Sequence, residues 1–202
     1  AVGATLPRDS VNTNTGWPKM MTSVTPFANN AKFTLVMCIK TAVDSVNQNL
    51  LVVGSTIIVN RNSGNKLAIT IKDTAATNII SWANTLTTNF NIAGGTTWLA
   101  LSIDAGVPSV SCYSGRNASD VDIATGAAGA NNGTINIASA APVVFAASTT
   151  GYATYSGAVK SVWMATGVSY DFSNSANRRL FWNTDGTPVD LGADGSTGTG
   201  AS

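Results

Sequence analysis

Apolar residues recur at every second position in several short stretches of this chain, which is the pattern of half-buried β-strands. In residues 33–40, Phe33, Leu35, Met37 and Ile39 share one face, and the other face is mixed. Residues 66–72 (KLAITIK) alternate in the same way, directly after a run of turn-forming residues at 62–65. Further strands are predicted at 49–60 (two strands, divided at Gly54 and Ser55), 98–104, 110–113, 134–138, 142–147 and 158–165.

Helical spacing is confined to one short turn at 175–181, and residues 114–133 have the composition of a loop. About ten short strands at this spacing are typical of two packed antiparallel sheets. The sequence therefore predicts an all-β, two-sheet antiparallel jelly-roll sandwich over residues 31–182. An extended N-terminal arm (1–30) precedes it, and a Gly/Asp/Thr-rich tail (183–202) follows.

The predicted arm is too apolar to be a free tail, because it contains Trp17, Met20, Met21 and Phe27. These side chains are expected to lie on the domain itself or on a neighbouring subunit. They are the candidate assembly contacts, with a homo-oligomer or another protein as the partner.

Composition removes whole classes of chemistry. The chain of 202 residues has no His, and all ten of its acidic residues are Asp. His-based catalytic triads, His metal sites and Glu general acids are therefore excluded, and no catalytic residue is assigned. A net charge of +1 offers no electrostatic attraction for nucleic acid or an anionic membrane, and no apolar run is long enough to span one.

No cofactor is expected, because the Gly-rich stretch 192–200 lacks the Lys and the following helix of a phosphate-binding loop. Asp120 and Asp122 are weak candidate ligands for Ca²⁺, against the alternative of two solvated acids in a loop. Cys38 and Cys112 both lie in predicted strands, as two small buried side chains or as a disulfide pair.

Three tyrosines are candidates for stacking on a sugar ring: Tyr113, Tyr152 and Tyr155, in or beside loops at 113–123 and 150–155. Aromatic side chains of a sandwich more often pack in its interior. A glycan surface at these loops therefore requires the rings to be exposed.

Two stretches of the middle of the chain resemble a known superfamily. TTWLALSIDAGVPSVSCYSG (96–115) and YSGAVKSVWMATG (155–167) are similar to strands of laminin-G-like, concanavalin-A-like lectin and glucanase domains. The resemblance implies the jelly-roll fold. It implies no hydrolase activity, since hydrolases on this fold use a Glu-x-Asp-x-x-Glu strand and this chain has no Glu.

The C-terminal stretch NRRLFWNTDGTPVDLGADGSTGTG (177–200) resembles a segment that closes lectin-like domains in structural proteins of tailed bacteriophages. Arg178, Arg179, Phe181, Gly186 and residues 188–196 match that segment, whereas Leu180, Thr187 and Gly198 depart from it. The resemblance implies a protein of the virion surface, assembled in the cytoplasm of a bacterial host.

The main functional hypothesis is accordingly a non-enzymatic capsid decoration or ancillary head protein, which binds the major capsid protein or its own copies through the arm. The alternative is a glycan-binding module that recognises the host from a phage tail or fibre. A carbohydrate-binding domain outside any virus is a third hypothesis.

Overall fold

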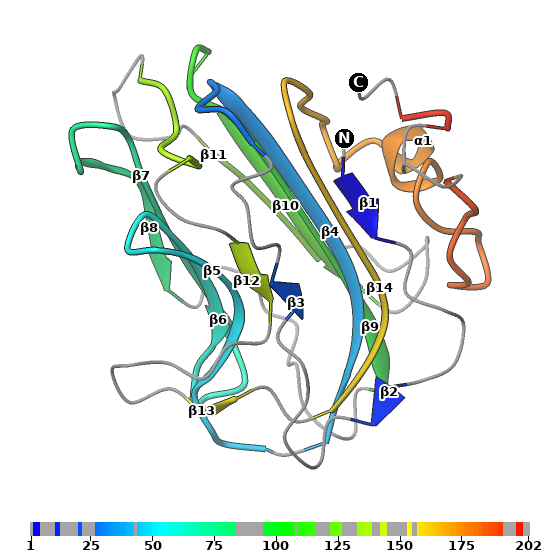
Figure 1. The fold of residues 1–202 in the computed structure, drawn as a ribbon. Coiled ribbons are helices and arrows are strands. Elements are labelled where there is room, and N and C mark those ends of the chain that lie inside the picture. The colour runs from blue at the N-terminus through cyan, green and yellow to red at the C-terminus, as the bar shows by residue number, and fades with distance from the viewer. Residues whose placement is uncertain are drawn as a thin grey trace.

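The fold is that of a computed structural model that describes residues 2–4, 11–12, 20–21, 27–42, 44–83, 95–107, 109–115, 122–126, 133–138, 142–144, 153–154, 157–191 and 197–199. Two layers of β-strands face each other across the molecule (Figure 1). The expected two-sheet all-β sandwich is therefore confirmed.

The first layer, called the β4 sheet, has the strand order β1-β14-β4-β9-β10-β11, and β2 also pairs with β14. All of its pairings are antiparallel. Its strands are β1 (Val2–Ala4), β2 (Val11–Asn12), β4 (Lys32–Thr41), β9 (Thr96–Asp104), β10 (Ser109–Gly115), β11 (Asp122–Gly126) and β14 (Gly157–Thr166).

The second layer, called the β5 sheet, has the order β3-β12-β5-β6-β7-β8. The short strand β13 runs parallel to β5, and the other pairings are antiparallel. Its strands are β3 (Met20–Met21), β5 (Gln48–Val53), β6 (Ile57–Arg61), β7 (Leu67–Lys72), β8 (Asn78–Ala83), β12 (Pro142–Val144) and β13 (Ala153–Thr154).

The main core lies between the two sheets and uses one face of each strand. From β4 it takes the face predicted from sequence, Phe33 to Ile39 at alternate positions, and from β7 it takes Leu67, Ile69 and Ile71. The strands predicted at 49–60, 98–104, 110–113 and 158–165 are confirmed. Strands β8 and β11 were not predicted, and β11 corrects the expectation that 114–133 is wholly a loop.

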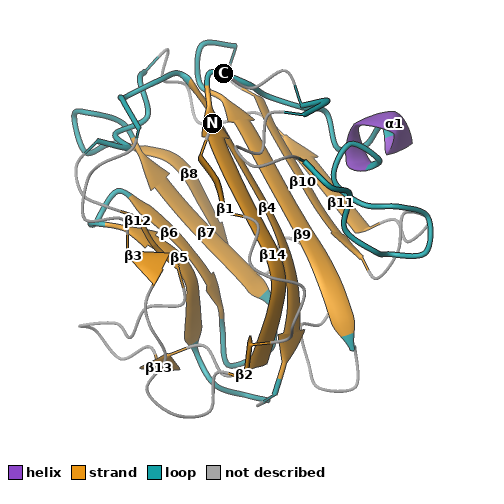
Figure 2. Cartoon of the chain, turned by 45° about the vertical axis from the view of Figure 1, so that its right-hand side comes forward, coloured by secondary structure: helices purple, strands orange, loops and turns teal. Residues whose placement is uncertain are grey.

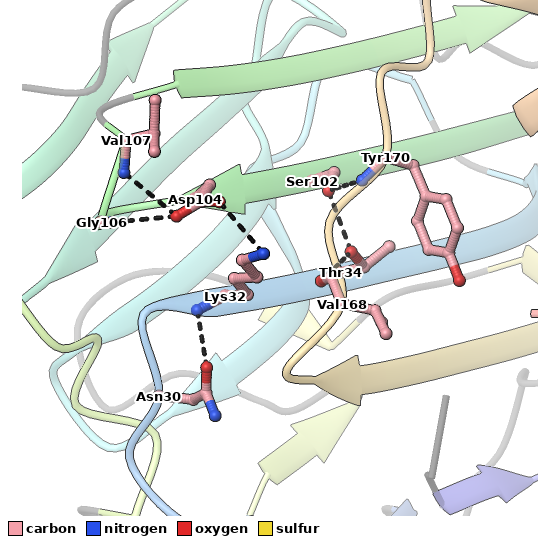
Figure 3. A network of polar contacts seen from close by, with 9 residues as sticks. All are labelled: Asn30, Lys32, Thr34, Ser102, Asp104, Gly106, Val107, Val168 and Tyr170. Carbon is pink, nitrogen blue, oxygen red and sulfur yellow. Dashed lines mark hydrogen bonds and ion pairs between the residues drawn. The ribbon is translucent and has the colours of Figure 1, made fainter. Parts of the chain in front are cut away.

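The outer face of the β4 sheet is covered by the chain that follows β14. Thr34, Ser102 and Ser111 lie opposite one another on β4, β9 and β10 and present a row of hydroxyl groups. Thr34 Oγ1 donates to Val168 O, while Ser102 Oγ and Ser111 Oγ accept from the backbone N–H groups of Tyr170 and Phe172. Figure 3 shows the first two of these contacts. The row thus fixes the backbone of residues 168–172 across three strands.

Beyond this crossing, α1 (Ser175–Arg178) and the following loop lie outside the β4 sheet (Figure 2). Trp182 stacks on Trp98 with ring centroids 4.6 Å apart, and Trp98 Nε1 donates to Gly186 O over 2.9 Å. Gly186 has a φ of 81°, which favours glycine. A second hydrophobic cluster results on the outside of the sheet: Val36, Cys38, Trp98, Ala100, Tyr113, Trp163, Ala165, Phe172, Phe181, Trp182 and Leu191.

The described parts of the predicted arm and tail lie on the domain. Phe27 is buried in the main core, which corrects its assignment as an assembly contact. Met20 and Met21 form β3 and pair with β12, whereas Trp17 lies outside the described residues. In the predicted tail, Leu191 is buried against the outer cluster. The boundary at Trp182 therefore falls within one packed segment.

Both cysteines are buried thiols. Cys112 belongs to the main core and Cys38 to the outer cluster, so they lie on opposite faces of the same sheet and do not form a disulfide. Burial raises the pKa of the Cys38 thiol to about 12. In the part of the chain that the structure describes, no helix is long and apolar enough to cross a membrane.

Removing the ring of Trp182 should destabilise the domain, because the stack on Trp98 and the cover over Tyr113 are lost together. Trp182→Ala should lower the free energy of unfolding by about 3–5 kcal/mol in urea titrations. Val107→Ala is the matched control, since Val107 is 70% exposed, and should change it by less than about 0.5 kcal/mol. Equal effects of the two substitutions would show that the C-terminal segment does not stabilise the sheet.

Candidate functional site

Tyr113 is not available to a ligand. Its side chain has no exposed surface, its ring centroid lies 5.4 Å from that of Trp182, and Arg178 Cζ lies 4.8 Å from the ring centroid. Arg178 is held there by bonds from Nη1 to Phe172 O and Ser173 O. The prediction of a glycan contact at Tyr113 is corrected, because the C-terminal segment covers the face to which this ring points.

The other predicted site residues are only partly described. Tyr152, Tyr155 and Asp120 lie outside the described residues, and Asp122 begins β11 opposite Ser114. No group of three or more metal-ligating His, Cys, Asp or Glu side chains occurs in the described part of the chain. The two residues between the tyrosines form β13, which pairs with Gln48 and Asn49 of β5.

At one end of the β4 sheet, polar side chains form a network of contacts within the domain. Lys32 Nζ lies 3.5 Å from Asp104 Oδ2, and Asp104 Oδ1 accepts from the backbone N–H groups of Gly106 and Val107 (Figure 3). Lys32 N donates to Asn30 Oδ1. Each of these polar contacts closes a turn or joins two strands, so the network is structural.

A second cluster of polar side chains lies where the β4–β5 connection, the β6–β7 turn and β13 come together, at the lower end of the view in Figure 1. The sequence Asn47-Gln48-Asn49 runs antiparallel to Asn60-Arg61-Asn62. Gln48 lies opposite Arg61, and Asn49 lies opposite Asn60. Because side chains alternate between the faces of a sheet, Asn49 and Asn60 fall on the face opposite to Gln48 and Arg61.

The inward pair, Gln48 and Arg61, closes this end of the main core. Arg61 has no exposed surface, and its guanidinium donates from Nη2 to Gln48 Oε1 over 2.6 Å and from Nη1 to Asn65 Oδ1 over 2.5 Å. Asp44 Oδ1 lies 4.0 Å from Arg61 Nη1, and the Asp44 side chain is 42% exposed. A buried cation is therefore balanced by amide oxygens and by one carboxylate at the surface.

Asn49 and Asn60, together with Asn47 and Asn62 in the adjoining connections, are called the asparagine quartet. Asn49 and Asn60 are 3% and 6% exposed, and the Oδ1 atom of each is buried without a hydrogen-bond partner. Leaving such an oxygen unpaired costs about 1–3 kcal/mol. At the turn, Asn47 and Asn62 are half-buried, with Oδ1 atoms that accept from the backbone N–H groups of Ser63 and Gly64.

A β-bulge in β5 sets the register of the quartet. The pairing of β5 with β6 shifts between Asn49 and Leu51, and both Leu50 and Leu51 are fully buried in the main core. The extra residue thus adds a second leucine to the core while Asn49 stays opposite Asn60. Bulges often re-aim side chains beside functional sites.

The connections beside the quartet hold a strained backbone. Ser45 and Asn65 have φ angles of 57° and 60°, in the left-handed region that residues other than glycine rarely adopt. Ser45 N donates to Asn65 Oδ1 over 2.9 Å, which joins the two connections. Strain of this kind persists where the surrounding contacts enforce it, and it clusters at functional sites.

The quartet was not predicted from the sequence, because residues 62–65 were interpreted only as a turn. The available signal was the repeated Asn-x-Asn pattern at 47–49 and 60–62, in which polar residues interrupt two strongly apolar strands. Its meaning depends on the register that the bulge sets, and the sequence pattern does not fix that register.

No protein-family model matches the chain, and no curated protein matches it. Several solved structures, however, match its fold. The CBM40 of the Ruminococcus gnavus IT-sialidase, bound to α2,6-sialyllactose, matches with a TM-score of 0.54 and 14% identity over 87% of this chain and 96% of that chain.

Two further matches are domains LG4-5 of the mouse laminin α1 chain and a heptameric SAP-like pentraxin of Limulus polyphemus. Their TM-scores are 0.53 and 0.52, at 12% and 11% identity. The laminin match covers 79% of this chain and 41% of that chain, and the pentraxin match covers 80% and 76%. Identities this low establish the fold alone, which is the jelly roll of lectin-like and laminin-G-type domains.

Loss of the Arg61 guanidinium should destabilise this end of the core. Arg61→Met leaves the buried Gln48 oxygen without its donor, and should lower the free energy of unfolding by about 3 kcal/mol in urea titrations. Arg179→Met, at an exposed arginine, is the control and should have an effect within about 0.5 kcal/mol. An unchanged denaturation midpoint for Arg61→Met would refute the structural role of this guanidinium.

Proposed function

We propose that this chain is a non-enzymatic carbohydrate-binding domain, and that hydroxyl groups of a glycan bind at the asparagine quartet. The observation that carries the proposal is the pair of unpartnered Oδ1 atoms on Asn49 and Asn60. The fold supports it, since a carbohydrate-binding module and lectin-like domains share the same two-sheet arrangement.

The chemistry of the quartet suits sugars. A sugar hydroxyl donates one hydrogen bond and accepts others, and an Asn amide offers both a carbonyl acceptor and two N–H donors. Hydroxyls that donate to the oxygens of Asn49 and Asn60 would satisfy atoms that the folded chain leaves unpaired. The half-buried Asn47 and Asn62, whose Oδ1 atoms are fixed by backbone N–H groups, hold their amides in one orientation for a ligand.

The alternation of the sheet supports this location. The outer face of the β4 sheet is occupied by the C-terminal segment, whereas the half-buried side chains on the outer face of the β5 sheet include Ile58, Ala68 and Thr70. Ala68 lies opposite Asn60, and Thr70 lies opposite both Ile58 and Ser81.

The non-enzymatic part of the proposal rests on composition. The chain has neither His nor Glu, so the common general acids and bases of glycoside hydrolysis are missing from it. Asp44, in the connection that leads to Asn47, has its carboxylate 4.0 Å from Arg61 Nη1, whereas hydrolysis of this kind requires a pair of carboxyl groups.

A glycan array, followed by calorimetry with the strongest ligand, tests the proposal. Asn60→Ala should weaken binding at least tenfold, because a ligand hydroxyl loses its acceptor. Since Oδ1 of Asn60 has no partner in the free protein, the substitution should lower the free energy of unfolding by less than about 1 kcal/mol.

Asn78→Ala, at an exposed asparagine of the same sheet, is the matched control and should bind as the parent protein does. If no glycan on the array binds, or if Asn60→Ala binds as tightly as the parent protein, the proposal is refuted.

We also propose, as a second function, a place on the surface of a bacteriophage virion, where the domain would bind the major capsid protein or other copies of itself. The supporting observation is the resemblance of residues 177–200 to a segment of phage structural proteins. Arg178, Phe181 and Leu191 of that segment are buried and hold it on the β4 sheet.

Electron cryomicroscopy of the particles from a lysate that contains this protein tests that location. Regular copies on the capsid lattice are expected, with residues 1–26 in contact with a neighbour. Particles that lack the chain altogether would refute the virion proposal and leave the carbohydrate-binding proposal intact.

A further inference from the structure

We propose that β8 is an interaction surface, and that it pairs in antiparallel orientation with β8 of a second copy of this chain. β8 is the last strand in the order of the β5 sheet, and its strand partner β7 lies on one side of it (Figure 1). Within the described part of the chain, no hydrogen bond joins the backbone of residues 78–83 to a segment other than β7. The backbone N–H and C=O groups on the other side of β8 are therefore available to a further strand.

The other outermost strands are shorter than β8 or carry a charge. Proteins protect the edges of sheets with very short strands, charged side chains, prolines or bulges. Among the described strands that end the two sheets, β3 has two residues, β1 has three, and β11 begins with the charged Asp122. β8 has six residues and contains neither a charged residue nor a proline. It is therefore the edge with the weakest protection against pairing.

A β-bulge interrupts β8 near its start and leaves the rest of the strand regular. The pairing with β7 shifts at Ile79, which is an extra residue on β8. From Ile80 to Ala83, each residue lies opposite the next residue of β7 in an unbroken register. These four residues form a regular edge that an incoming strand can follow.

The alternation of side chains restricts how two copies can pair. Ile80 is buried in the main core and Trp82 packs against that core, whereas Ser81 is exposed. Residues directly opposite each other in an antiparallel pair lie on the same face of the sheet. The register that places Ser81 opposite Ser81 of the second copy keeps these faces aligned. Trp82 then lies opposite Ile80 of the second copy, and an aromatic ring beside a β-branched side chain is a favourable cross-strand pair.

Two properties of this edge favour a second copy as the partner. Identical antiparallel strands are related by a two-fold axis, so the two copies use the same groups and the contact closes as a dimer. Because β8 carries no charge, the approach of an identical strand brings no like charges together. The half-buried Trp82 also gives each copy an apolar side chain that the other copy can cover.

The dimer would place the outer faces of both β5 sheets on one side of a continuous sheet. Five strand spacings separate β6 of one copy from β6 of the other, which is a distance of about 24 Å. For the proposed carbohydrate-binding function, on which this consequence alone rests, two quartets on one side bind a glycan-covered surface more tightly than one. Formation of the dimer itself requires no glycan.

Sedimentation velocity of the full chain, without glycan, tests the pairing. The parent protein should form a dimer whose fraction rises with concentration up to about 1 mM. Ser81→Lys should weaken the dimer by about tenfold or more, because it places two like charges directly opposite each other at the two-fold axis. Thr74→Lys, at an exposed residue of the turn before β8, is the matched control and should dimerise as the parent protein does. A parent protein that stays monomeric throughout, or equal dimerisation by the two variants, would overturn the proposal and leave the carbohydrate-binding function standing.

A cysteine at the same position tests the register. Cys38 and Cys112, the two cysteines of the chain, are buried, so an added exposed thiol is the one that mild air oxidation can join between copies. Ser81→Cys should form a disulfide-linked dimer, because facing Cβ atoms of antiparallel strands lie about 4.5–5.5 Å apart. Asn78→Cys, at an exposed residue of the same strand, is the control and should cross-link about tenfold more slowly. Equal rates of cross-linking at the two positions would refute the assigned register. Circular dichroism of each variant verifies that it is folded.

Discussion

The structure depends on a single constraint, which is that the β4 sheet is apolar on both of its faces. Alternate residues of β4, β9 and β10 belong to the main core, and the residues between them include Val36, Trp98 and Tyr113. A sheet of this kind must be covered twice. The β5 sheet covers one face, and the chain after β14 covers the other.

The segment after β14 is held on the β4 sheet by hydrogen bonds as well as by hydrophobic contacts. The hydroxyls of Thr34, Ser102 and Ser111 contact the crossing backbone at every second residue from 168 to 172, so the crossing takes one position across the sheet. Trp182 then stacks on Trp98, and Trp98 in turn donates to the turn at Gly186. One outer face of the sandwich is therefore occupied by the chain itself.

Much of the fold was predictable because alternation is a local property of the sequence. The strands at 32–41, 48–53, 57–61 and 67–72 have period-two patterns or turn residues that identify them directly. Strand β11 was missed, since Ile123 is its only large apolar residue and it forms by pairing with β10. Tyr113 was assigned to a glycan surface because the sequence does not tell which segment covers the outer face of β10.

The candidate site was less accessible to prediction than the fold, since it depends on long-range register. Asn49 faces Asn60 only because a bulge places Leu50 and Leu51 together in the core. Without that bulge, the alternation would turn Asn49 toward the inside and Gln48 away from Arg61. The core and the quartet are thus coupled through one extra residue.

The C-terminal resemblance acquires a physical meaning from the same packing. Arg178 binds the backbone oxygens of Phe172 and Ser173, Gly186 provides a left-handed turn, and Leu191 is buried in the outer cluster. Arg178, Gly186 and Leu191 therefore contribute to closing the β4 sheet. Proteins of different function that need the same closure would retain these residues, so the resemblance is evidence for how the domain is completed. On the opposite sheet, the buried Oδ1 atoms of Asn49 and Asn60 remain without hydrogen-bond partners.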